Sequence, residues 1–314
     1  MLSQIGYFFE PDAGLVFAAL QQQQPLESGG SRSFLPVVGA MTAAWTEARL
    51  DMDGEALAAR IYRPAMPLRP APLVLHLHGG CFVDGDLDCS AHLCRIMAEA
   101  GAVVVSIDYP LAPEHPFPAA LNLSFKALGR LSAERAKWAG RGARLFVAGE
   151  EAGANLATAL SLMARDQQAP PLAGQILISP MVDPSLCTGS IHAASAGASG
   201  CKWADGWHLY LGSADRAAHP YAAPLGSRRL GGLAPALIVT SADCPIRDES
   251  LAYAERLRAG GVSVESHLLE GTNCSNQSID AAIEAAPAWE TVLRGLFSTF
   301  LAEHSAAPLR TIRA

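Results

Sequence analysis

The chain has 314 residues, half of them hydrophobic, so it can bury one large core without a second domain. Its formal net charge is −7, from 30 acidic and 23 basic side chains, and the basic side chains form no block. This balance disfavours nucleic acid and anionic membrane surfaces as partners.

The start of the chain and its cysteines predict a cytoplasmic protein. The first ten residues lack the basic region and cleavage site of a signal peptide, and no apolar run reaches membrane-spanning length. The seven cysteines are an odd number and contain no Cys-x-x-Cys pair. This pattern argues against a secreted disulfide framework and against a zinc-finger-like site.

Taken in chain order, the sequence begins with a predicted cap segment over residues 1–40, built from helix and loop. Short apolar strands then alternate with helical patterns. The strands are predicted at 73–77, 103–107, 145–148, 174–178, 236–240 and 264–268, and the helices at 90–100, 119–131, 155–165 and 250–259. A second cap segment is predicted over 184–212 and a loose tail over 306–314.

This alternation predicts an α/β fold with a mostly parallel central sheet, flanked by helices on both faces, in a single domain over residues 1–314. In open parallel sheets, ligands bind beyond the carboxyl ends of the strands. The loops that follow the strands are therefore the places to look for chemistry.

Three such loops carry a recognisable pattern. The strand at 73–77 is followed by His78-Gly79-Gly80-Cys81-Phe82, the strand at 103–107 by residues 108–120, and the strand at 145–148 by Gly149-Glu150-Glu151-Ala152-Gly153. Over residues 35–300 the chain resembles the hormone-sensitive-lipase branch of the α/β-hydrolase superfamily, which contains bacterial carboxylesterases and plant carboxylesterase-like proteins. The resemblance implies an α/β-hydrolase fold with a helical cap, no cofactor, and a homodimer as a frequent state.

The three positions of the family's catalytic triad hold other residues here. The family's Gly-x-Ser-x-Gly elbow carries a Ser nucleophile, and this chain has Glu151 at that position. Alignment on Pro245–Glu249 puts Cys244 at the family's acid, and alignment on Glu270-Gly271 puts Cys274 at its His. We therefore expect a degenerate triad.

The oxyanion loop of the family is altered less. His78, Gly79 and Gly80 keep its pattern, and Ala152 would supply the donor of the elbow. Cys81 adds a side chain where the family usually has glycine, so we expect a narrower hole. For His78 we favour a structural role, in which it orients this loop through backbone contacts.

A carboxyl group at a half-buried turn is expected to have a raised pKa. Beside an oxyanion hole, such a group suits proton abstraction next to a carbonyl. The leading hypothesis is thus a non-hydrolytic enzyme, a lyase, isomerase or cyclase, with Glu151 as the general base and a small apolar carbonyl or acyl compound as the ligand. One alternative is a binding or sensor protein without turnover, and another is an atypical carboxylesterase-like hydrolase.

Two further groups leave several interpretations open. Cys244 and Cys274, the other candidate catalytic residues besides Glu151, are expected to lie close together as buried thiols or as a disulfide. Two further possibilities are one cysteine as a nucleophile and both cysteines with Glu151 as three ligands of a metal ion. Buried thiols are favoured, so no metal is expected. Trp203, Trp207 and Tyr210 are candidates to line an apolar pocket, but aromatic side chains at this spacing also serve simple cap packing.

Overall fold

The computed structural model describes residues 43–65, 70–194, 201–270 and 279–306. The predicted cap segment over 1–40 and all but the first residue of the predicted tail lie outside these ranges, and so does Cys274. In the described ranges, no helix is both long and apolar enough to cross a membrane.

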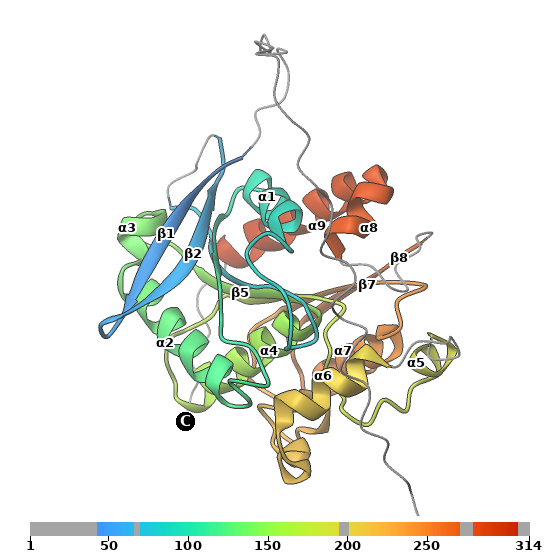
Figure 1. Ribbon diagram of the computed structural model, residues 1–314. Coiled ribbons are helices and arrows are strands. Elements are labelled where there is room, and N and C mark those ends of the chain that lie inside the picture. Colours follow the sequence, from blue (N-terminus) through green and yellow to red (C-terminus); the bar gives the residue numbers. More distant parts are fainter. Residues whose placement is uncertain (1–42, 66–69, 195–200, 271–278, 307–314) are drawn as a thin grey trace, which may run out of the picture. The chain divides into compact units, whose positions relative to one another are not determined.

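The described strands form one eight-stranded sheet in the order β1-β2-β4-β3-β5-β6-β7-β8. Figure 1 shows β1 and β2 at one side of the sheet and β8 at the other. The strands β3 to β8 pair in parallel, whereas β1 and β2 are antiparallel, which confirms the predicted, mostly parallel α/β fold. The bounds are Ala44–Met52 for β1, Glu55–Arg63 for β2, Leu73–Leu77 for β3, Val103–Ile107 for β4, Leu145–Glu150 for β5, Gly174–Ile178 for β6, Ala236–Ser241 for β7 and Val264–Leu269 for β8.

The hairpin of β1 and β2 is an element that the sequence analysis missed. Its register pairs Met52 with Glu55, so that Asp53 and Gly54 alone form the turn. Both turn residues have positive φ, 58° and 100°. Asp-Gly is a strong signal for such a two-residue turn, and it was available in the sequence.

Helices cover both faces of the sheet because its strands are apolar on both sides. Along β3, Leu73, Leu75 and Leu77 belong to one core, and Val74 between them belongs to the other. The helices α2 (Ala119–Ala133), α4 (Glu151–Asp166), α6 (Lys202–Leu211) and α7 (Arg247–Ala259) contribute to the first core, and α1 (Ala91–Glu99), α8 (Ile279–Ala285) and α9 (Pro287–Ala306) to the second. The chain also forms α3 (Arg135–Ala139) and α5 (Gly189–Ala194).

The segment predicted as a second cap contains α5 and α6 in its described part. Helix α6 ends at Gly212, whose φ of 66° lets it close the helix as a left-handed C-terminal residue. A cap function for this segment stays a prediction. Its position nevertheless matters, because α6 brings two side chains to the site described next.

Candidate active site

The turn from β5 into α4 places Glu151 at its tip. Glu151 is the first residue of α4 and has a φ of 50°, in the left-handed region that a residue with a side chain rarely adopts. A Cβ atom on Gly153 would lie 2.1 Å from the backbone oxygen of Leu77, at the end of β3. The glycine therefore lets α4 begin directly against the neighbouring strand, and the predicted helix starts four residues earlier than expected.

The glycine loop after β3 closes on Glu151. The backbone N–H groups of Gly80 and Cys81 both donate to Oε2 of Glu151, at 3.0 and 3.3 Å. Two backbone donors that converge on one oxygen form an oxyanion hole. The Glu151 carboxylate occupies this pair of donors, one of which belongs to Cys81, the residue that was expected only to narrow the hole.

The other carboxylate oxygen, Oε1, faces helix α6. It accepts a hydrogen bond from Nε1 of Trp203 at 2.9 Å and one from Sγ of Cys81 at 3.3 Å. The ammonium group of Lys202 lies 3.6 Å away from Oε1 and 4.8 Å from the centre of the Trp203 ring. Helix α6 can come this close because a Cβ on Gly206 would lie 2.3 Å from the backbone oxygen of Cys81.

These contacts decide the charge of Glu151. Burial raises the pKa of the carboxyl group, but the charge of Lys202 and the hydrogen bonds from Gly80, Cys81 and Trp203 outweigh burial, and its pKa lies below the usual value. Glu151 is therefore ionised at neutral pH. The expectation of a raised pKa is wrong, because the sequence analysis considered the burial of the turn without these partners.

A second acidic residue, Glu150, contacts the glycine loop, and the sequence analysis did not assign it. Glu150 is only 5% exposed and accepts hydrogen bonds from the Ser90 hydroxyl and, at 3.3 Å, from the N–H of Gly79. It thereby fixes the first glycine of the loop. The sequence shows two adjacent glutamates at the elbow, and the sequence analysis considered only Glu151.

The site opens into a cavity of about 190 Å³. Residues from the loops after β3, β6 and β7, from the ends of β5 and β6 and from the starts of α4 and α6 line it: Gly79, Gly80, Asp84, Gly85, Cys89, Glu150, Glu151, Ile178, Ser179, Lys202, Trp203, Cys244, Pro245 and Ile246. Of the predicted site residues, the structure thus brings Glu151, Cys244, Gly79, Gly80 and Trp203 together at one cavity. Its lining combines apolar side chains such as Ile178 and Ile246 with charged ones such as Glu151 and Lys202.

Cys244 lies at this cavity beside a serine that the sequence analysis missed. The Cys244 thiol donates to Oγ of Ser179 at 3.4 Å, and the Ser179 hydroxyl is 3.0 Å from Oγ1 of Thr240. Ser179 directly follows β6, at the carboxyl end of the strand, and that position was its signal. Cys274 is outside the described residues, so its predicted neighbourhood with Cys244 stays a prediction.

His78 is fully buried and does not line the cavity. Its Nδ1 is 2.8 Å from the backbone oxygen of Gly79, and its ring stacks on that of Tyr109 at 4.2 Å. The Tyr109 hydroxyl in turn donates to the backbone oxygen of His78 at 2.7 Å. Burial lowers the pKa of His78, so its imidazole is neutral. These contacts support a structural role in which His78 and Tyr109 hold the loop.

The remaining predicted residues lie in the core next to the site. Trp207 and Tyr210 are not among the residues that line the cavity; both pack against the ring of Phe82, at 5.1 and 3.8 Å between ring centres. Ala152 follows Glu151 in α4 and is completely buried. Contact of these three residues with a ligand stays a prediction.

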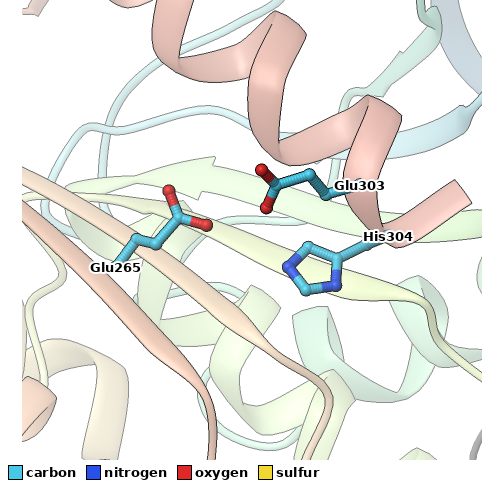
Figure 2. A group of neighbouring side chains, drawn as sticks. All are labelled: Glu265, Glu303 and His304. Atoms are coloured by element: carbon cyan, nitrogen blue, oxygen red, sulfur yellow. The ribbon is translucent and has the colours of Figure 1, made fainter. Parts of the chain in front are cut away.

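A separate group of ionisable side chains comes from β8 and the end of α9. Glu265, Glu303 and His304 each place one potential metal-ligand atom within 4.8 Å of the others (Figure 2). None of the three lines the cavity. The group therefore takes no part in the chemistry considered for Glu151.

The loop that leads away from Ser179 is held by a buried carboxyl group. Glu249 of α7 is 2% exposed and accepts hydrogen bonds from the N–H groups of Val182 and Asp183, at 3.3 and 2.7 Å. Burial raises its pKa well above the usual value, and these hydrogen bonds only partly offset that effect. Ionisation of Glu249 therefore costs the folded state free energy as the pH rises.

We expect Glu249→Gln to stabilise the protein at high pH. The pKa of Glu249 is higher in the folded state than in the unfolded chain. Its contribution to the free energy of unfolding is therefore fully present below the unfolded-state pKa and is lost as the pH rises through the folded-state pKa. The gain in melting temperature of the variant should thus be larger at about pH 8 than at about pH 5. Glu255→Gln, which changes an exposed carboxylate, is the control. An equal gain at both pH values would contradict the argument.

Comparison with known proteins relates the site to a reaction class. A family model described as alpha/beta hydrolase fold matches residues 74–275. Carboxylesterase NlhH of Mycobacterium tuberculosis is 35% identical over 255 residues, 79% of each chain, and the ethyl acetate hydrolase of Pseudomonas putida is 33% identical over 244 residues, 74% of this chain and 76% of the relative. The crystal structure of esterase LipW from Mycobacterium marinum is similar with a TM-score of 0.73 and 32% identity, over 84% of this chain and 83% of that chain.

These relatives overturn the expectation of non-hydrolytic chemistry. All three are named as ester hydrolases, so the predicted lyase, isomerase or cyclase is wrong, and so is the alternative of a binding or sensor pseudoenzyme. The physical reason lies in Glu151. The prediction assumed a carboxyl group that stays largely protonated because of a raised pKa, whereas the contacts of Glu151 lower its pKa and keep it ionised, as the activation of a water molecule requires.

Proposed function

Because the chain belongs to the alpha/beta hydrolase fold family, we propose that it hydrolyses small carboxylic esters at the cavity lined by Glu151. The observation that carries the proposal is the ionised Glu151 carboxylate at the elbow, in contact with the two N–H donors of the oxyanion hole. In this proposal Glu151 is the general base that activates a water molecule. The names of the relatives support the reaction class and the ester substrate.

The two sets of donors around Glu151 suggest how a substrate enters. The ester carbonyl oxygen takes over the N–H groups of Gly80 and Cys81 from Oε2, while Oε1 keeps its partners Trp203 and Lys202. The carboxylate then lies beside the carbonyl carbon, with one water molecule between them. Hydrogen bonds to the developing oxyanion contribute about 3 kcal/mol per donor in hydrolases.

The reaction proceeds without a covalent bond between the protein and the substrate. Glu151 accepts a proton from the water as its oxygen bonds to the carbonyl carbon, and the negative charge develops on the oxygen in the hole. Collapse of the tetrahedral intermediate breaks the bond to the alcohol oxygen, which receives the proton from Glu151. One ester and one water give one acid and one alcohol, and no histidine is needed to resolve an acyl group.

The test is hydrolysis of p-nitrophenyl acetate and butyrate by the purified protein, combined with mass spectrometry of samples quenched during turnover. We expect steady turnover and an unmodified protein mass. An acyl adduct would instead assign the attack to a protein nucleophile and contradict the water route. Absence of turnover with both esters would contradict the proposed function.

We also propose the cytoplasm as the location of the protein and a homodimer as its state. The odd number of cysteines, without a Cys-x-x-Cys pair, supports the location. The resemblance to the carboxylesterase branch supports the dimer. Size-exclusion chromatography with light scattering measures the oligomeric state directly.

A further inference from the structure

The Glu151 carboxylate is bound as an independent carboxylate ligand would be. Four hydrogen-bond donors contact it: the N–H groups of Gly80 and Cys81, the thiol of Cys81 and the indole N–H of Trp203. The ammonium group of Lys202 forms an ion pair with it at 3.6 Å. These groups come from two elements distant in sequence, the loop after β3 and helix α6. Each oxygen has its own set, and hydrogen bonds to a charged acceptor are the strong ones.

The donors of this site all bind the Glu151 carboxylate. Burial raises the pKa of the Cys81 thiol, so Cys81 stays protonated and remains a donor. Among the described acidic side chains, Glu151 is the one that forms an ion pair with Lys202. Without the Glu151 carboxylate, the ammonium group and the two convergent N–H groups would lose the anion that they contact. Such a cradle attracts an anion of the same shape.

The length of the side chain explains why a glutamate fills this site. In an acylated serine, the carbonyl carbon is joined to Cβ through one oxygen atom. In Glu151 the carboxyl carbon is joined to Cβ through one carbon atom, Cγ, so the two carbonyl groups reach equally far from the elbow. The Oε2 atom of Glu151 therefore lies where the carbonyl oxygen of an ester, or one oxygen of the acid released from it, would bind.

We propose that the oxyanion hole, together with Trp203 and Lys202, is a carboxylate-binding site whose resident ligand is Glu151, and that it binds small organic carboxylates when this side chain is removed. The role in the native protein rests on the proposed function. The acid product of ester hydrolysis belongs to the same ligand class, and the return of Glu151 to the hole displaces it. An attached competitor acts at a high effective concentration, so the native site releases free acids.

The experiment compares the binding of sodium acetate and sodium butyrate to the wild type and to Glu151→Ala, by calorimetry and thermal shift at constant ionic strength. We expect at least tenfold tighter binding of butyrate to the variant than to the wild type. Butyramide, which has the same shape without the charge, should not show this difference. Glu151→Gly serves as a second variant, because glycine tolerates the positive φ of the elbow.

Two double variants identify the donors. Adding Lys202→Met or Trp203→Phe to Glu151→Ala should reduce the gained affinity at least threefold, because the first removes the ion-pair partner of Oε1 and the second its indole donor. Equal affinity of the wild type and both folded single variants would overturn the proposal, and so would double variants that bind as well as Glu151→Ala. None of these readouts requires turnover, so a failure of the proposed esterase activity is seen separately.

Discussion

Replacing Glu151 by glutamine is expected to lower kcat/KM for p-nitrophenyl acetate at least a hundredfold, or about 2.7 kcal/mol of transition-state stabilisation. Glutamine has the size of glutamate but accepts no proton from water. Its amide N–H₂ group also replaces an oxygen that faces donors, because the Oε1 position is surrounded by Trp203, Lys202 and the Cys81 thiol. Both effects act on the reaction, and neither removes apolar packing.

The control for this variant is Glu255→Gln, an exposed carboxylate of α7 that does not line the cavity, and its kcat/KM should equal that of the wild type. The pH profile gives an independent check. Because the pKa of Glu151 lies below its usual value, the base stays ionised, and the wild-type rate should remain flat as the pH falls from about 7 to about 5. Full activity of Glu151→Gln would mean that another group activates the water.

Gly153→Ala is expected to destabilise the protein by about 3 kcal/mol, the upper part of the usual range for overpacking. The added methyl group would lie 2.1 Å from the backbone oxygen of Leu77 and 2.3 Å from that of His78. These are backbone atoms at the end of a central strand, so they cannot rotate away as a flexible side chain would. The first turn of α4 must move instead, and Glu151 moves with it.

Chemical denaturation of Gly153→Ala measures the loss of stability. Gly129→Ala is a matched control, because this glycine lies within α2 and a Cβ there has no atom within 4 Å. The control should be as stable as the wild type or more stable by about 0.5–1 kcal/mol, since alanine favours a helix over glycine. If both variants had the same stability, close packing of the elbow against β3 would not be the reason for Gly153.

Much of the fold followed from local sequence patterns. The parallel strands β3 to β8 were predicted within two residues of their ends, because each is a short apolar run bounded by turn or helix signals. The hairpin of β1 and β2 was missed because only the alternation of strands and helices was followed. The Asp53-Gly54 pair is nevertheless typical of its two-residue turn. The cavity-lining residues Ser179 and Glu150 were also missed, because no motif singled them out.

The sequence by itself determined the α/β fold, the elbow with Glu151 at its tip and the glycine loop that faces it, because these depend on short-range patterns and on a family motif. Only the tertiary structure decided the charge of Glu151. Its decisive partners, Lys202 and Trp203, are about 50 residues away along the chain, and they reach the carboxylate because Gly206 lets α6 pack on the loop at Cys81. Desolvation acts wherever a group is buried, but the charges and donors that offset it depend on which distant elements meet.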